Sequence, residues 1–125
     1  MRLLISEPQQ CLYEPNAAIL KAGAFNFIAQ KFKLNKIAPN SHLYTSEKRI
    51  ENFPGRTFKI ENTVAYNPKD FKKLDIKKAN VACRNFKEKP AAIKKKLKLK
   101  DGGDNYIFAT TNQNNKPILI CCSKY

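Results

Sequence analysis

Lysine carries most of the potential chemistry of this sequence, and it is concentrated in one segment. Residues 69–100 contain 13 lysines and arginines against 3 aspartates and glutamates. Positive side chains of this kind neutralise the phosphates of a polyanion and release its counterions. The residues that we predict to contact nucleic acid are Lys77, Lys78, Arg84, Lys94, Lys95, Lys96, Lys98 and Lys100.

Catalytic chemistry is not indicated by the other polar residues. His42 is the only histidine, and no serine or cysteine accompanies it at a spacing typical of a catalytic pair. Gly102 and Gly103 lack the spacing of a phosphate-binding glycine loop, so we predict that they end a helix and form a turn. Asp101 and Asp104 follow a run of lysines, which favours surface ion pairs. We therefore expect neither a catalytic site nor a cofactor site within these residues.

The four cysteines are Cys11, Cys83, Cys121 and Cys122, and no two of them have a C-x-x-C spacing. Cys121 and Cys122 are neighbours on a predicted strand, so their side chains point to opposite faces and cannot hold one ion together. We expect reduced cysteines and no metal site.

Aromatic residues close to the lysines offer a way to stack unpaired bases. Phe86, Tyr106 and Phe108 are the candidates. Their placement on predicted strands favours core positions instead. The sequence therefore predicts contact with phosphates and no readout of bases.

The composition indicates a folded protein. The chain has 125 residues, a net charge of +14 and 42% hydrophobic residues. This length suits one domain or two very small ones, with enough apolar residues for a core. The longest apolar runs fall far short of the ~20 residues of a membrane span, and residues 1–8 lack the apolar stretch of a secretory signal. We expect a cytoplasmic protein with no membrane partner.

The positive charge divides unevenly at Phe53. Residues 1–52 carry 7 basic and 4 acidic residues, a net of +3, and residues 53–125 carry 17 and 6, a net of +11. Phe53-Pro54-Gly55 is also the clearest turn signal, so we place a boundary there. Self-repulsion of this charge favours an anionic partner, and an extended polyanion fits better than a small ligand.

The strongest helical pattern follows Pro15. Glu14 or Asn16 is the expected N-cap, and proline is tolerated in the first turn. Apolar residues at spacings of four and three predict one buried stripe: Ala18, Ala22, Phe25, Ala29 and Phe32, widened by Leu20, Phe27 and Ile28. The other elements predicted before the boundary are a turn at 39–40, a strand at 42–45 and a helical turn at 46–51.

Strands and short helices alternate after the boundary. The predicted elements are a strand at 57–66, a helix starting at Pro68, a strand at 79–86, a helix starting at Pro90, and strands at 106–111 and 117–123. Asn67 is the expected N-cap of the first helix, while Ile93 and Leu97 face the core from the second. The last two strands form a predicted hairpin, and the final strand is apolar on both faces, which favours a central position in the sheet.

Six segments occur in an order that matches a known family. They are Leu12–Phe25, Leu43–Ser46, Phe53–Arg56, Ala79–Phe86, Lys95–Gly103 and Tyr106–Thr110. Together they resemble the C-terminal region of a bacterial family of class I SAM-dependent methyltransferases. The resemblance implies an α+β fold in which a ferredoxin-like segment, residues 1–52, precedes a THUMP-like α/β module, residues 53–125, with a mixed sheet and short helices.

The resemblance also implies a function and partners. THUMP modules are associated with RNA-modifying enzymes and present RNA to a neighbouring catalytic domain. In the family that domain lies upstream and binds S-adenosylmethionine (SAM), so we expect this chain to represent the C-terminal part. The implied partners are RNA, either tRNA or rRNA, and the catalytic domain of the same polypeptide.

A second interpretation comes from another class of protein. The chain would then be an interaction module that docks on the catalytic domain without contacting RNA, and its basic surface would serve solubility. An autonomous small enzyme is a third interpretation, which the absence of a nucleophile pair or a metal-ligand set disfavours.

Overall fold

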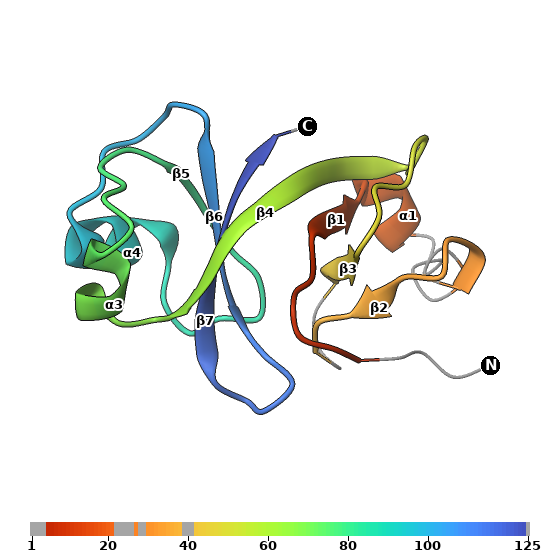
Figure 1. Ribbon diagram of the computed structural model, residues 1–125, viewed down its shortest axis with the longest axis horizontal. Coiled ribbons are helices and arrows are strands. Elements are labelled where there is room, and N and C mark those ends of the chain that lie inside the picture. The colour runs from red at the N-terminus through yellow and green to blue at the C-terminus, as the bar shows by residue number, and fades with distance from the viewer. Residues whose placement is uncertain (1–4, 22–26, 28–29, 39–41, 125) are drawn as a thin grey trace.

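The computed structural model describes residues 5–21, 27, 30–38 and 42–124. In chain order the elements are β1 (Cys11–Pro15), α1 (Ala17–Lys21), β2 (Asn35–Lys36), β3 (Tyr44–Ser46), β4 (Gly55–Ala65), α3 (Pro68–Lys72), β5 (Asn80–Cys83), α4 (Pro90–Leu97), β6 (Asn105–Thr111) and β7 (Pro117–Lys124). Within these residues the strands form one seven-stranded sheet in the order β2-β3-β1-β4-β7-β6-β5 (Figure 1).

The sheet is mixed. Neighbouring strands are antiparallel except for β5 and β6, which are parallel. The described helices are short, and none of them is long and apolar enough to cross a membrane. The predicted α+β class, with a mixed sheet and short helices, is confirmed.

Strand β4 belongs to both halves of the sheet, and Figure 1 shows it passing from one half to the other. Its first residues, Gly55–Lys59, pair with β1, and Phe58–Ala65 pair with β7. Glycine is required at position 55, where β4 begins beside the end of β1, because a Cβ atom there would lie 2.1 Å from the carbonyl oxygen of Glu14. The turn at Phe53-Pro54 thus leads directly into the strand that joins the two halves. The division of the chain into two domains, at residues 1–52 and 53–125, stays a prediction.

Most elements of the C-terminal half form as their local patterns predict, although the strand predicted at 79–86 is shorter and β5 ends at Cys83. The Oδ1 atom of Asn67 accepts a hydrogen bond from the N–H of Lys69 at 2.9 Å, as expected of an N-cap. In α4 the side chains of Ile93 and Leu97 are buried. Strands β6 and β7 form the predicted hairpin, and β7 lies between β4 and β6 with five consecutive buried residues.

Two hydrophobic cores lie on opposite faces of this sheet. Helices α3 and α4 cover one face and pack on side chains of β6 and β7, among them Cys121. On the other face Phe58, Phe108 and Cys122 pack with apolar residues of the N-terminal half. Cys121 and Cys122 therefore point to opposite faces, as predicted.

The N-terminal half contains a strand where a helix start was predicted. Residues Cys11–Pro15 form β1, which is hydrogen-bonded to β3 on one side and β4 on the other. Pairing on both sides outweighs the local preference of Glu14 and Pro15 for a helix start. The helix α1 begins at Ala17, and Glu14 does not cap it.

The predicted apolar stripe of this helix is wrong at two positions. Ala18 is exposed, and Phe27 is 65% exposed. Phe32 is partly buried against Phe53, with ring centroids 5.8 Å apart. The predictions for Ala22, Phe25, Ile28 and Ala29, and for the turn at 39–40, lie outside the described residues, and the Leu20 side chain is not described.

The helical turn predicted at 46–51 is also wrong. Side-chain hydroxyls form hydrogen bonds with the backbone groups that would be paired with one another in a helical turn. Ser46 Oγ donates to the carbonyl oxygen of Lys48 at 2.7 Å, and the N–H of Ile50 donates to the hydroxyl of Tyr13 at 2.9 Å. The segment bends around the Tyr13 side chain instead.

Helix α4 ends before the predicted glycine stop. Lys98 adopts a left-handed conformation (φ 57°, ψ 46°) directly after the helix. The N–H of Leu99 donates to the carbonyl oxygen of Lys94 at 2.8 Å, which is the closing bond of a Schellman motif, and Leu99 is buried. Gly102 and Gly103, with φ of 104° and 80°, form the later turn into β6.

Candidate functional site

Helix α4 displays lysines because its apolar residues face inward. Ile93 and Leu97 are four residues apart and anchor the helix on the sheet. The lysines between and after them, at positions 94, 95, 96 and 98, surround the C-terminal end. Positive charge is favourable there, because the helix dipole is negative at that end.

A short parallel bridge brings a second group of lysines close to α4. Lys78 and Lys100 are bridge partners. The N–H of Lys100 donates to the carbonyl oxygen of Lys77 at 3.0 Å, and the N–H of Ala79 donates to the carbonyl oxygen of Lys100 at 2.9 Å. The fold thus places Lys77 and Lys78 beside Lys100, although more than twenty residues separate them in sequence.

A hollow of about 320 Å³ lies between α3, the C-terminal end of α4 and the segment that precedes β5. Its rim carries four lysines, Lys72, Lys77, Lys96 and Lys98, and one acidic residue, Asp75. The apolar part of its lining consists of Pro68, Phe71, Ile76 and Leu97. We call this site the lysine hollow.

The lysine hollow gathers three of the eight predicted residues, Lys77, Lys96 and Lys98. Lys78, Lys94, Lys95 and Lys100 lie outside its lining. Sequence reasoning missed Lys72, which lies on α3 next to the buried Phe71. The signal was available, because the capped helix starting at Pro68 displays Lys72 when Phe71 faces inward.

Acidic neighbours engage two of the α4 lysines. Lys94 Nζ donates to Asp101 Oδ1, so the predicted surface ion pair of Asp101 is confirmed. Lys96 Nζ lies 3.9 Å from Glu88 Oε2 and 4.9 Å from the centroid of the Tyr66 ring. Ion pairs at an exposed surface contribute little, so both lysines remain able to exchange these partners for phosphate.

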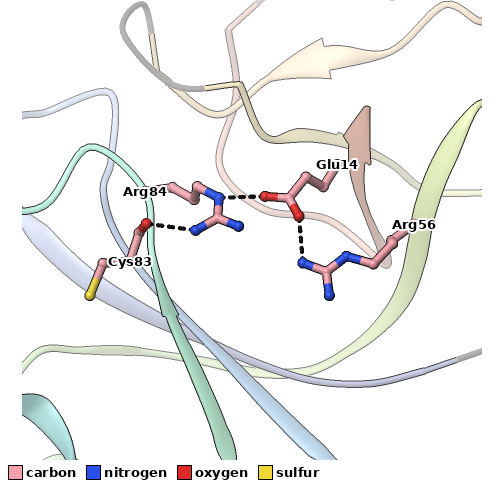
Figure 2. Close-up of polar contacts among 4 residues, drawn as sticks. All are labelled: Glu14, Arg56, Cys83 and Arg84. Carbon is pink, nitrogen blue, oxygen red and sulfur yellow. Dashed lines mark hydrogen bonds and ion pairs between the residues drawn. The ribbon is translucent and has the colours of Figure 1, made fainter. Parts of the chain in front are cut away.

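Arg84 lies apart from these lysines, beside strand β1. Its Nε donates to Glu14 Oε2, its Nη1 donates to the Cys83 carbonyl oxygen at 2.8 Å, and Arg56 Nη2 donates to Glu14 Oε1 at 2.5 Å. Figure 2 shows both guanidinium groups directed at the one carboxylate. We call Glu14, Arg56 and Arg84 the Glu14 cluster. It was not predicted, because its members are distant in sequence.

The electrostatics of the Glu14 cluster favour the ionised carboxylate. Burial by itself raises the pKa of Glu14, but the hydrogen bonds and charges of Arg84 and Arg56 outweigh it and lower the pKa below its ordinary value. Two positive charges then face one negative charge, and a net positive charge remains. The arginine side chains are 46% and 39% exposed, so this charge is accessible to solvent.

The three aromatic candidates occupy different environments. Phe108 is buried, as predicted. Phe86 is partly buried edge-to-face with Tyr66, at a centroid distance of 5.2 Å, beside a hollow of about 200 Å³. Tyr106 is partly exposed and lines a separate hollow on the other face of the sheet.

Three of the cysteines, Cys83, Cys121 and Cys122, are poorly suited to nucleophilic chemistry. Burial raises the pKa of Cys121 to about 12 and raises that of Cys122 and Cys83 as well, which disfavours the reactive thiolate. Among the described residues, no group of three or more metal-ligating side chains comes together. His42 is exposed.

The described residues do not fit a SAM-binding loop. Such a loop needs glycines that let the backbone approach the ligand after a strand. Gly102 and Gly103 precede β6, and the protein's own Lys78 side chain borders the space where their Cβ atoms would lie, with Lys78 Cε 3.1 Å from a Cβ atom placed on Gly102. No step involving SAM is assigned to this chain.

Comparisons with known proteins agree with this architecture. A family model described as a ferredoxin-like domain matches residues 12–54, and one described as THUMP domain-like matches residues 55–124. The chain is similar to the crystal structure of a "putative methyltransferase" from Porphyromonas gingivalis W83, with 36% identity and a TM-score of 0.90. The match covers 99% of this chain and 32% of that one. No curated protein matches the chain significantly.

Proposed function

Because this chain belongs to the THUMP domain-like family through residues 55–124, we propose that it is the RNA-binding and substrate-positioning region of a class I SAM-dependent RNA methyltransferase. The ferredoxin-like match and the similarity to the P. gingivalis protein support this context. The proposed catalytic domain, with its SAM, belongs to the part of such a protein that lies outside these residues, and it acts in the cytoplasm.

The lysine hollow is the observation that carries the proposal. Its four lysines come from α3, from the segment before β5, and from α4 and its C-terminal end. Only the folded chain brings these charges together, and the bridge continues them to Lys78 and Lys100. A row of point charges at an exposed surface matches the phosphates of a folded RNA.

The chemistry of the chain in this proposal is binding alone. Lysines contact phosphates without reading sequence, so they orient the RNA on the C-terminal half. The Glu14 cluster ties β1 to β4 and to the residue that follows β5, and so holds the two halves of the sheet in one arrangement. A fixed orientation presents one region of the RNA to a neighbouring catalytic domain.

The experiment compares two triple variants of this chain. Lys77, Lys96 and Lys98 are changed to Glu in the first variant, and the exposed Lys48, Lys59 and Lys124 are changed to Glu in the second. Both variants have the same net charge. Fluorescence anisotropy with labelled tRNA and an rRNA stem-loop at fixed salt measures affinity, and circular dichroism monitors the fold.

We expect the first variant to lose at least tenfold more affinity than the second, since it removes specific phosphate contacts. Equal losses would show that the positive charge acts only in bulk, and would contradict the lysine hollow as the site. No affinity of the unaltered chain for either RNA would favour the docking module instead.

A further inference from the structure

Another hollow lies on the sheet face opposite α3 and α4, beside strands β5 and β6. Its volume is about 270 Å³, and it is lined by Arg56, Asn80, Val81, Ala82, Tyr106 and Phe108. In the sheet register Asn80 pairs with Tyr106 and Ala82 with Phe108, so these four side chains share one face. The lysine hollow lies on the other, helix-covered face.

Tyr106 is the accessible ring of an aromatic cluster. The Phe58 centroid lies 5.2 Å from that of Tyr106 and 5.1 Å from that of Phe108. Phe58 and Phe108 are buried, whereas Tyr106 is partly exposed toward the hollow. The buried Phe58 ring, itself packed on Phe108, holds Tyr106 in place.

Two arginines lie against the same cluster. Arg56 Cζ lies 5.3 Å from the Phe58 ring centroid, and Arg84 Cζ lies 6.0 Å from that of Phe108. Glu14 contacts both guanidinium groups but neutralises only one of the two charges. Stacking and ion pairing therefore hold a net positive charge at the edge of an aromatic surface, before any ligand is present.

Asn80 adds an acceptor to this hollow. Its Nδ2 donates to the carbonyl oxygens of Gly103 and Asn105, at 3.1 and 3.4 Å. The amide is thereby oriented, and within the described part of the chain Oδ1 accepts no hydrogen bond. An amide oxygen of this kind suits the N–H of a heterocycle.

We propose that this hollow binds an unpaired nucleobase of RNA, stacked on Tyr106, with Arg56 and Arg84 contacting the adjoining phosphate. The proposal deepens the proposed function and rests on it. A partly exposed ring, a nearby cationic pair and an oriented amide together match the three parts of a single-stranded nucleotide. The hollow is close to the lower limit of ligand pockets, ~300 Å³, which suits one flat ring.

The test separates base contacts from phosphate contacts. The probes are a fluorescent RNA decamer of adenosines, the same decamer with abasic sites in place of five bases, and a blunt RNA duplex. The variants are Tyr106→Leu, Tyr106→Phe and, as the matched control, Tyr66→Leu. Tyr66 is another partly buried tyrosine of the C-terminal half, located near α4.

We expect the unaltered chain to bind the complete decamer about 5- to 150-fold more tightly than the abasic one, the range typical of base–aromatic stacking. Tyr106→Leu should abolish this preference and leave duplex binding unchanged, whereas Tyr106→Phe and Tyr66→Leu should retain it. A preference that survives Tyr106→Leu, or is lost in Tyr66→Leu, would overturn the proposal.

Two further measurements keep the outcomes distinct. If Tyr106→Leu fails to fold, photo-cross-linking of the unaltered chain to an oligomer with 5-iodouridine locates the base: a Tyr106 cross-link supports the site, and one confined to Tyr66 or Phe86 contradicts it. The triple variant of Lys77, Lys96 and Lys98 should weaken duplex binding and keep the base preference. If the unaltered chain binds the duplex weakly and the triple variant binds it equally weakly, the lysine hollow is rejected as the RNA site. The Tyr106 site would not be affected by that result.

Discussion

Glu14 accepts a hydrogen bond from Arg84, a residue 70 positions later in the chain. The pair joins strand β1 of the N-terminal half to the end of β5, at the opposite edge of the C-terminal half. Arg56 of β4 completes the contact. One largely buried carboxylate thus links β1, β4 and the end of β5. Sheet hydrogen bonds join β1 to β4, but they join neither of these strands to β5.

Replacing this carboxylate should destabilise the protein. Glu14→Gln removes the charge-assisted hydrogen bonds and leaves two arginines facing each other, so we expect a loss of about 1–3 kcal/mol in the free energy of unfolding. Urea denaturation measures it. Glu88→Gln is the control, because Glu88 lies 3.9 Å from Lys96 at the surface and should change the free energy by less than about 0.5 kcal/mol. Equal effects of the two changes would contradict a structural role for Glu14.

The same carboxylate predicts a pH dependence. The pKa of Glu14 is lowered in the folded state, so its contribution to stability is present above the unfolded pKa of ~4.3 and is lost as the pH falls through the folded pKa. Denaturation of the unaltered protein and of Glu14→Gln between pH 7 and pH 3 should show two stabilities that converge in acid. A gap that stays constant to pH 3 would place the effect elsewhere.

The backbone of β1 leaves no room for a side chain at Gly55, where β4 begins. A Cβ atom would lie 2.1 Å from the Glu14 carbonyl oxygen and 2.8 Å from the Pro15 Cα, both backbone atoms that cannot move aside cheaply. We expect Gly55→Ala to cost more than about 2 kcal/mol of folding free energy, measured by thermal or urea denaturation. Gly103→Ala is the comparison for a cost that comes from backbone conformation alone. Alanine is strained at the Gly103 φ of 80°, but the nearest atom to its Cβ would be a Lys78 side-chain carbon at 3.5 Å, so no backbone clash arises.

The ion pair between Lys94 and Asp101 should weaken RNA binding. Asp101→Asn removes a negative charge from the lysine-rich surface and frees Lys94, so we expect RNA affinity to rise about two- to fivefold at low salt. Asp104→Asn is the matched control for charge. Anisotropy titrations measure both variants. An equal rise in the two would mean that only net charge matters, and the Lys94 pair would have no specific effect.

Local signals explain why the C-terminal half could be predicted. The Asn67 cap, the proline that opens α4 and the turn between β6 and β7 each act within a few residues of the element they define. Strand β1 could not be predicted in this way, because its partners lie in β3 and β4 and its sequence contains a glutamate and a proline. The same glutamate looks like a helix cap in sequence and forms an ion pair in the structure.

The candidate sites also combine features that local sequence predicts with contacts between residues that are distant in sequence. The lysine-rich composition predicts a basic surface, yet the arrangement of Lys72 and Lys77 around one hollow depends on how α3 packs beside α4. Arg84 follows β5 whereas Lys77 and Lys78 precede it, and Glu14 engages Arg84 from another part of the sheet. Tyr106 lies on a strand with buried neighbours, so periodicity alone assigns it to the core and does not reveal the hollow beside it.

If the lysine hollow binds RNA through several phosphates, the affinity must fall steeply as the salt concentration rises. The logarithm of the RNA affinity is measured against the logarithm of salt concentration for the unaltered chain and for a variant with Lys77, Lys96 and Lys98 changed to Gln. We predict a steep negative slope for the unaltered chain, and a slope smaller in magnitude by about 2–3 for the variant, roughly one for each lost contact. Identical slopes for the two proteins would contradict the account.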